Sequence, residues 1–308
     1  MHRSSYHDSV MPDESTGFLV HRPNGCYADF TLGGGGHSNR ILEKLGPNGR
    51  LFGFDQDPNA WPNAPVDPRF TLVKGNFSFA ANFLRAFNAL PLDGYLADLG
   101  VSSHQFDEAG RGFSIRYDAR LDMRMNPTSV LTAAKVINEY EPKELAQILG
   151  NYGSIDKPFR IVNRLVAERS KEPVETTGKL IELLRPFSKP GEENQFYARV
   201  FQALRMEVNS ELEVLKRLLE QTPQLLNEGG RAVVISYHSG EDQLVKRFFQ
   251  FGNFEGKSVK DFYGNLLRPL HPLTRKVIVP TEQEVAQNPR SRSAKMRVAE
   301  KLTQTPKL

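Results

Sequence analysis

Length, composition and charge already limit what this chain is. Its 308 residues correspond to about two domains at roughly 150 residues each, and 39% of them are hydrophobic. That share is enough for a sizeable core, which excludes a disordered or collagen-like protein. No run of about 18 apolar residues predicts a membrane span. The net charge of +4 is too small to identify a partner by itself.

The charge is unevenly distributed along the chain. Residues 1–110 carry 8 basic and 12 acidic side chains, whereas residues 221–308 carry 14 basic and 8 acidic ones. An acidic first third and a basic last third suggest separate surfaces for separate partners, although ordinary surface charge would give the same pattern.

The single cysteine and the N-terminus set the expected compartment. Cys26 alone excludes an internal disulfide framework and a Cys-rich zinc site, and we expect it to be a small buried hydrophobe. Residues 1–15 contain no apolar core, so no signal peptide is predicted. A cytoplasmic protein without a metal site is the resulting expectation.

Strand-like and helix-like stretches alternate over the first hundred residues. Strands are expected at 26–32, 51–55, 70–73 and 94–98, and helices between them around 41–45 and 80–90. This alternation predicts parallel strands joined by right-handed crossovers, which is a doubly wound α/β sheet.

The alternation stops after residue 103, where only helical patterns follow until about residue 190. The clearest of these are at 135–140, 142–149 and 159–168. Later in the chain we expect a long helix at 201–219, a buried strand at 231–236, a helix at 241–249, and closing strands at 276–279 and 294–299. The sequence therefore predicts one mostly parallel sheet interrupted by a helical insertion.

Four glycines follow the first strand, at 33–36, and precede the first helix of this sheet. Glycines there allow a sharp turn and close approach of a ligand, although a plain tight turn is the alternative. The dinucleotide fingerprint would place a third glycine at position 38, which is Ser38, and this weakens a nicotinamide interpretation.

Candidate ligand-binding residues stand where the next three strands end. Asp55 comes 22 residues after Gly33, where a carboxylate accepts hydrogen bonds from ribose hydroxyls. Phe77 could flank an adenine, and Asp98 could contact the base or an amino-acid end. Ligands bind outside the carboxyl ends of parallel strands, so an adenosine-containing cofactor is predicted. Asp57 is expected to be a solvated loop acid.

Several longer motifs are more specific than the strand ends. They include 98–107 (DLGVSSHQFD), 111–118 (RGFSIRYD) and 121–127 (LDMRMNP). Further segments are 29–38 (DFTLGGGGHS), 54–58 (FDQDP), 201–212 (FQALRMEVNSEL), 236–242 (SYHSGED) and 288–295 (NPRSRSAK). Together they closely resemble one family, the bacterial small-subunit ribosomal RNA (cytosine-N4) methyltransferases of the MraW or RsmH type. The resemblance extends over nearly the whole chain.

The resemblance implies a seven-stranded Rossmann-like methyltransferase sheet with an inserted all-helical domain. Residues 1–108 and 201–308 would form the methyltransferase domain, and 109–200 the substrate-recognition insertion. The family's cofactor is S-adenosylmethionine. By motif, Gly35, Gly36 and His37 would line its methionine side, Asp55 would bind the ribose, Phe77 would flank the adenine, and Asp98 and Gln105 would close the pocket. No catalytic residue is assigned.

The implied reaction is methylation of a cytosine N4 in the decoding region of 16S ribosomal RNA, on the small subunit or its assembly intermediate. The family also allows for a homodimer, and its target base has to leave its stack. Three alternatives stay open: methylation of another nucleobase amine, a nicotinamide-dependent oxidoreductase, and an RNA-binding assembly factor without catalysis.

Two basic stretches are candidate RNA contacts. Four arginines alternate with two aromatics in the insertion, which suits RNA, but nearby Asp118 and Asp122 allow an internal salt-bridged loop instead. The residues concerned are Arg111, Phe113, Arg116, Tyr117, Arg120 and Arg124. The other stretch, which a solvated strand face would also explain, contains Arg290, Arg292, Lys295 and Arg297. His238 is expected to make a structural hydrogen bond.

The chain departs from the family pattern at several positions. Gly34 stands where Arg is usual, His104 replaces a Pro, and Gly240 replaces a Leu. Residues 195–199 (QFYAR) stand where members usually read HPATR, and residues 7–14 match only loosely. The change at 195–199 is expected to bear on how RNA is held.

Overall fold

The computed structural model describes residues 9–264 and 266–302. The chain divides into two compact units, which are described separately. The sheet unit consists of the parts before Val101 and after Glu211, and the helical unit of Val101–Glu211. Residues 1–8, which include part of the loosely matching stretch, lie outside the described residues. No helix in the described ranges is long and apolar enough to cross a membrane.

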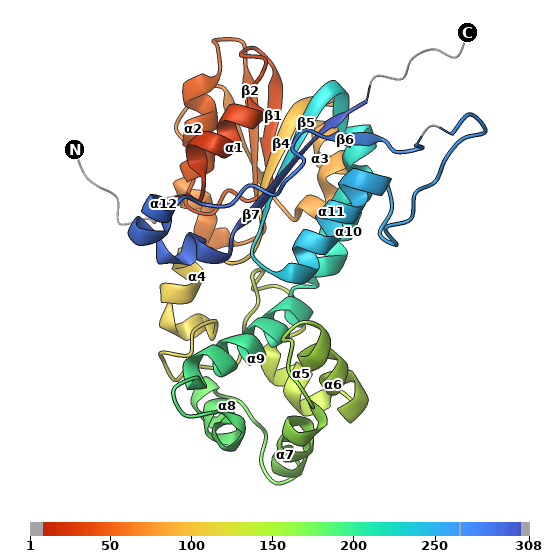
Figure 1. Ribbon diagram of the computed structural model, residues 1–308. Coiled ribbons are helices and arrows are strands. Elements are labelled where there is room, and N and C mark those ends of the chain that lie inside the picture. The colour runs from red at the N-terminus through yellow and green to blue at the C-terminus, as the bar shows by residue number, and fades with distance from the viewer. Residues whose placement is uncertain (1–8, 265, 303–308) are drawn as a thin grey trace. The chain divides into compact units, whose positions relative to one another are not determined.

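The sheet unit is built on a seven-stranded sheet in the order β3-β2-β1-β4-β5-β7-β6 (Figure 1). The strands are β1 (Cys26–Asp29), β2 (Arg50–Asp55), β3 (Phe70–Lys74), β4 (Leu92–Asp98), β5 (Leu226–Ser236), β6 (Leu270–Pro272) and β7 (Lys295–Lys301). Strands β1 to β5 pair in parallel, whereas β7 is antiparallel to both β5 and β6. The doubly wound, mostly parallel sheet is confirmed.

Helices cover both faces of the sheet because successive strand residues are buried on alternate sides. Tyr27, Leu51 and Leu96 pack with α1 (Pro12–Leu19) and α2 (Gly36–Lys44). The following residues of the same strands, among them Ala28 and Phe52, belong to a core on the other face. That face is covered by α3 (Ala80–Ala86), α10 (Glu211–Leu225) and α11 (Ser239–Phe251), and α12 (Glu282–Gln287) precedes β7.

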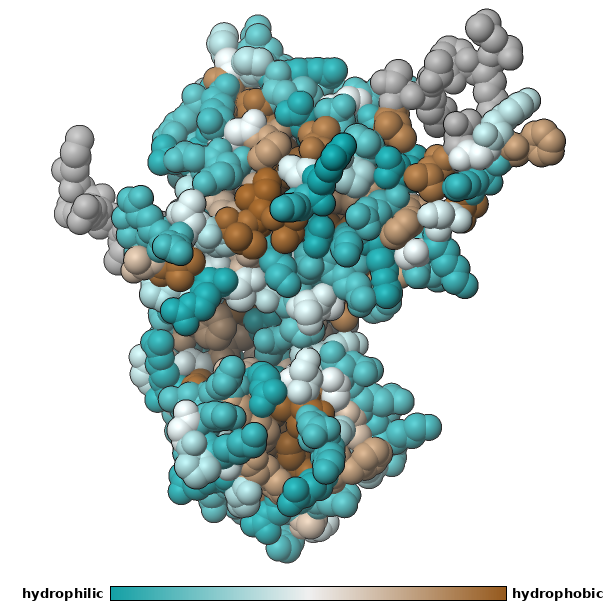
Figure 2. All heavy atoms as spheres, viewed as in Figure 1, coloured by the Kyte–Doolittle hydropathy of each residue, from teal (hydrophilic) through white to brown (hydrophobic). Residues whose placement is uncertain are grey.

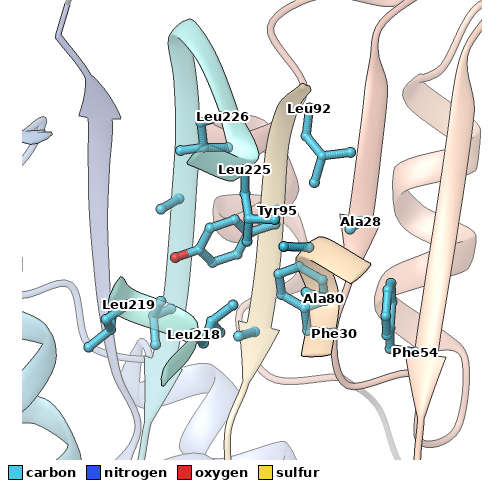
Figure 3. Close-up of a cluster of buried hydrophobic side chains, with 14 of the residues drawn as sticks. Ala28, Phe30, Phe54, Ala80, Leu92, Tyr95, Leu218, Leu219, Leu225 and Leu226 are labelled. Carbon is cyan, nitrogen blue, oxygen red and sulfur yellow. The ribbon is translucent and has the colours of Figure 1, made fainter. Parts of the chain in front are cut away.

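Aromatic rings fill the centre of this second core (Figure 3). The Phe30 ring lies 5.0 Å from both the Phe54 and the Tyr95 rings, measured between centroids. The Tyr95 hydroxyl is buried and lies 2.7 Å from the Thr222 hydroxyl of α10. These contacts fix the strands of the sheet against their covering helices, so the loops that follow β1, β2 and β4 begin from a rigid base.

The helical unit has its own core, to which all of its longer helices contribute. Its helices are α4 (Ser103–Asp107), α5 (Ala133–Glu139), α6 (Pro142–Asn151), α7 (Phe159–Arg169), α8 (Thr177–Leu184) and α9 (Glu193–Val208). The unit is wider than the expected range 109–200 because α9 buries side chains such as Phe201 and Leu204 in this core. Its role in substrate recognition stays a prediction.

Two expected elements are wrong. The single helix expected at 201–219 is two helices, α9 and α10, separated at Asn209 and Ser210. The Asn209 side chain accepts from the Met125 N–H (2.7 Å) and donates to the Met123 carbonyl (2.8 Å), which ends α9 there. The strand expected at 276–279 is only a single bridge between Ile278 and Met296, and the edge strand is β6.

Candidate cofactor site at the strand ends

Three acidic side chains stand at the carboxyl ends of neighbouring parallel strands. Asp29 ends β1, Asp55 ends β2 and Asp98 ends β4. The chain leaves β1 toward β2 on one side and later returns to β4 on the other. The edge above β1 and β4 is therefore the topological switch point, where open α/β sheets bind ligands.

The glycine loop is tied to the end of β2. Gly33 and Gly35 have φ angles of 48° and 77°, which residues other than glycine rarely adopt. A Cβ on Gly35 would lie 2.5 Å from the carbonyl oxygen of Asn63. The Asn63 amide donates to the Gly33 carbonyl (2.9 Å), and the Gly33 N–H donates to the Asp55 carboxyl (2.9 Å). The loop thus packs directly against residue 63, and position 35 has no room for a side chain.

Asp55 is a carboxyl held in one orientation. Its second oxygen accepts from the Asp57 N–H at 2.8 Å, and its backbone carbonyl accepts from the Trp61 indole at 3.1 Å. Burial raises the pKa of Asp55 to about 6, against the opposing effect of the two backbone hydrogen bonds. The group is ionised at pH 7 and above, where it can accept hydrogen bonds from two hydroxyls of a ribose.

The expectation for Asp57 is wrong. Its side chain is 3% exposed and accepts from the Asn59 N–H (3.1 Å), so it caps the short 3₁₀ helix Pro58–Asn63. Sequence position after a strand does not reveal whether a loop acid points to solvent or back to the chain. Asp57 therefore shapes the loop beside Asp55.

Asp29 and Ser38 explain why the third glycine of the dinucleotide fingerprint is absent. The Ser38 hydroxyl donates to the fully buried Asp29 carboxyl at 2.7 Å, and the Thr31 N–H donates to the other oxygen at 3.1 Å. Buried charge requires such partners. Position 38 thus serves the structure of the loop.

Replacing Ser38 with Ala is expected to lower the free energy of unfolding by about 1–3 kcal/mol, because Asp29 would lose one of its partners while staying buried. Urea unfolding followed by circular dichroism measures this. The exposed Ser170, whose hydroxyl bonds the Ala167 carbonyl, gives the matched control S170A, for which a change within about 0.5 kcal/mol is expected. Equal effects for both variants would contradict this role of Ser38.

His37, Asp98 and Tyr237 form a chain of side chains at the same edge. The His37 Nε2 lies 2.9 Å from the Val10 carbonyl, so Nε2 carries the hydrogen and Nδ1 faces Asp98 at 3.8 Å. The Tyr237 hydroxyl donates to the other Asp98 oxygen at 2.9 Å. Burial raises the pKa of Asp98 to about 6, and both His37 and Tyr237 oppose that rise. Sequence reasoning missed Tyr237, although it stands in the segment 236–242.

The replacement Tyr237→Phe removes the hydroxyl that donates to Asp98, so the pKa of Asp98 is expected to rise further above its present value. The acidic limb of the kcat/KM profile for the cofactor then shifts toward neutral pH. Tyr27→Phe is the matched control, because it deletes a buried hydroxyl that bonds backbone groups and not Asp98. An unshifted acidic limb in Tyr237→Phe would show that Asp98 does not govern it.

The remaining predicted residues lie in different places. Phe77 begins a short 3₁₀ helix after β3, half-buried, with its ring 6.1 Å from that of Phe30. Gln105 belongs to the helical unit, where its carbonyl oxygen accepts from the Ser102 N–H (3.0 Å) in a capping box at the start of α4. His104, the departure from the family pattern, lies in the same short helix. The sheet unit therefore contains all of the predicted cofactor residues except Gln105, which belongs to the helical unit.

Half of the candidate RNA contacts in the helical unit are structural. Arg124 makes a bidentate pair with Asp122 (2.8 and 2.7 Å), and Arg111 donates to the Arg124 carbonyl (2.7 Å). Phe113 is buried. The salt-bridged loop is thus the correct alternative for these residues. The side chains that remain exposed are Arg116, Tyr117 and Arg120.

The late basic stretch and His238 are also partly structural. Arg297 makes two bonds to Asp242 (2.7 and 3.1 Å), which ties β7 to α11. His238 Nδ1 accepts from the Gly240 N–H at 3.1 Å and so caps α11, as expected of a structural hydrogen bond.

Comparison with known proteins shows to which family the chain belongs. The MraW methylase family model matches residues 4–302. The chain belongs to this family. It is 51% identical over 300 residues to a protein of Parabacteroides distasonis named ribosomal RNA small subunit methyltransferase H, with 97% of this chain and 98% of that protein covered. A protein of the same name from Bacteroides fragilis is 48% identical over 298 residues, with 97% of this chain and 98% of that protein covered.

Among solved structures, an rRNA methylase from Streptococcus thermophilus is 11% identical, with a TM-score of 0.41 over 95% of this chain and 94% of that chain. Membership of the MraW family confirms the sequence-based resemblance and makes the chain a methyltransferase that uses S-adenosylmethionine. The tight glycine turn, the fixed carboxyl of Asp55 and the partly buried carboxyl of Asp98 fit an adenosine ligand with a charged amino-acid end.

Proposed function

We propose that this protein transfers the methyl group of S-adenosylmethionine to the exocyclic N4 of a cytosine in 16S ribosomal RNA. The observation that supports it is the near full-length similarity to small-subunit ribosomal RNA methyltransferases, together with the acids at the ends of β1, β2 and β4. The target is a cytosine of the decoding region, on the small subunit or its assembly intermediate. A cytoplasmic location and a homodimer are parts of the same proposal.

In this proposal, residues of the sheet unit bind different parts of the cofactor. Gly35, Gly36 and His37 line its methionine part, and Asp55 accepts from the ribose hydroxyls. Phe77 flanks the adenine, and Asp98 takes the amino-acid end, because it lies 3.8 Å from His37 in the loop that holds that part. Gln105 is assigned to the same pocket by motif alone.

The bound sulfonium supplies an activated methyl group, so the protein has to position the target nitrogen and does not have to activate it. The lone pair of cytosine N4 is conjugated with the ring. Holding this nitrogen in line with the methyl carbon lowers the activation barrier by several kcal/mol. The methylated nitrogen is acidic and loses its proton readily, which makes a strong general base unnecessary. The base has to be flipped out or single-stranded to reach the strand ends.

Transfer of labelled methyl groups tests this function. Purified protein is incubated with small subunits that lack the modification, with protein-free 16S rRNA, and with S-adenosylmethionine. Digestion to nucleosides is expected to yield N4-methylcytidine. Label in another nucleoside would show that a different base is the target. Cofactor binding without methyl transfer to either substrate would favour an assembly factor without catalysis.

A further inference from the structure

The chain between α11 and β6, residues 252–269, forms a hairpin on the sheet unit. Lys260 pairs with Leu266 in an antiparallel bridge, and the Leu267 N–H donates to the Val259 carbonyl at 2.8 Å. At the turn, the Gly264 N–H donates to the Asp261 carbonyl at 3.1 Å. Figure 1 shows this segment projecting beyond the edge of the sheet near β6. Its described residues therefore form a projection with a turn at 261–264.

Two aromatic side chains stand on that tip. Phe262 is 98% and Tyr263 85% exposed, and their rings lie 5.7 Å apart at 88°. Val259 and Leu267 below them are also exposed, at 50% and 55%. Figure 2 shows hydrophobic atoms on the projecting segment at the right of the view. Leu266 is exposed as well, at 40%. Single exposed apolar residues are common, but five on one short hairpin indicate a surface that a partner covers.

The charges beside the aromatics favour RNA as that partner. The exposed side chains of Lys257 and Lys260 are closer along the hairpin to the two aromatics than the exposed acid Glu255. Asp261 serves the turn itself, because its carboxylate accepts from the Tyr263 N–H at 2.9 Å. Exposed rings next to lysines are the combination with which proteins bind single-stranded nucleic acid, through base stacking and phosphate contacts.

We propose that this hairpin is a second RNA-binding element, in which Phe262 and Tyr263 stack on exposed bases of 16S rRNA and Lys257 and Lys260 contact phosphates. The proposal rests on the proposed function for the identity of the RNA. Its occupant is a single-stranded segment of the substrate other than the one that carries the target cytosine.

The register of the sheet places the hairpin far from the strand ends that hold the cofactor residues. Leu270, which follows the hairpin, pairs with Lys301 at the end of β7. At the other end of the β5–β7 pair, Ser236 pairs with Lys295, next to Tyr237. The five residue steps from Arg231 to Ser236 separate these ends by about 16 Å at 3.3 Å per residue. The hairpin thus binds the substrate remotely and does not touch the reacting base.

Because this contact is equally strong before and during methyl transfer, its loss should raise KM and leave kcat unchanged. In the double variant F262A/Y263A we expect the KM for small subunits and the Kd for protein-free 16S rRNA to rise at least about tenfold, since stacking on one base already contributes that much. The Kd for S-adenosylmethionine, measured by calorimetry, should stay the same. An oligonucleotide just long enough to hold the target cytosine at the strand ends should show no difference.

Matched variants identify the nature of the contact. F262Y/Y263F keeps both rings and should bind RNA like the parent, whereas F262L/Y263L keeps the apolar surface and should bind as weakly as the alanine variant. V66A, which truncates another fully exposed apolar side chain, should change neither constant. Peptides crosslinked to RNA by ultraviolet light should include residues 257–263.

Three results would overturn the proposal. The first is an unchanged RNA affinity in F262A/Y263A. The second is weaker binding to intact subunits but not to protein-free RNA, which would point to a ribosomal protein as the partner. The third is a changed oligomeric state with unchanged RNA affinity. A parent protein that binds 16S rRNA and S-adenosylmethionine but transfers no methyl group would refute the proposed function alone, since the hairpin's RNA affinity is measured without turnover.

Discussion

Replacing Asp55 with Asn is expected to weaken S-adenosylmethionine binding roughly 100-fold and to abolish methyl transfer at micromolar cofactor. The carboxylate would lose its charge and one acceptor atom, and hydrogen bonds to charged groups contribute about 1.5–3 kcal/mol each. The new amide N–H₂ would also face the N–H of Gly33 or of Asp57, which now donate to the two carboxyl oxygens. Isothermal titration calorimetry with S-adenosylhomocysteine measures the loss without turnover.

The pH dependence provides a second test of Asp55. Its pKa is about 6, so the acceptor form dominates at pH 8 and disappears as the pH falls through 6. Cofactor affinity should therefore decrease below pH 6 in the parent protein, and the part due to Asp55 should vanish in Asp55→Asn. Asp13→Asn, which changes an exposed acid on α1, is the control and should retain parental affinity. Parental affinity in Asp55→Asn would remove this residue from the site.

Replacing Asp98 with Asn is expected to weaken binding of S-adenosylmethionine and S-adenosylhomocysteine by about 10- to 100-fold. Both carry a cationic amino group, and the lost interaction is a charge-assisted hydrogen bond worth about 1.5–3 kcal/mol. Asparagine still accepts one hydrogen bond from Tyr237, so the local packing is retained.

Adenosine distinguishes the two positions that Asp98 could occupy against the cofactor. It lacks the amino-acid end, so its affinity should change less than about twofold in Asp98→Asn if this carboxylate binds that end. An equal loss for adenosine and S-adenosylhomocysteine would instead place Asp98 at the base. Competition against a fluorescent adenosine ligand gives both constants in one assay.

Local pattern made much of the site predictable. Asp55 and Asp98 each follow a run of buried apolar residues, and the glycines stand directly after β1, so strand ends could be located from the sequence. Position after a strand did not reveal side-chain direction. Asp57 was expected in solvent and is buried, because the short helix that it caps folds back over it.

Contacts between distant parts of the chain could not be predicted. Tyr237 bonds Asp98 across 139 residues, and no spacing rule links two strand ends that become neighbours only in the finished sheet. The break between α9 and α10 was missed for the same reason. The apolar period continues through it, and what ends α9 is the bond between Asn209 and the loop at Met123 and Met125.

The sequence by itself determined the doubly wound sheet, the helical insertion, the family and the acids at the strand ends, because periodicity and motifs are local properties of the chain. Only the tertiary structure decided which of the charged residues are free to bind. Arg111, Arg124 and Arg297 are occupied by internal partners, whereas the aromatic hairpin at Phe262 stands exposed. The sequence shows which side chains are charged. Whether a charged side chain is buried or paired depends on residues that only folding brings next to it.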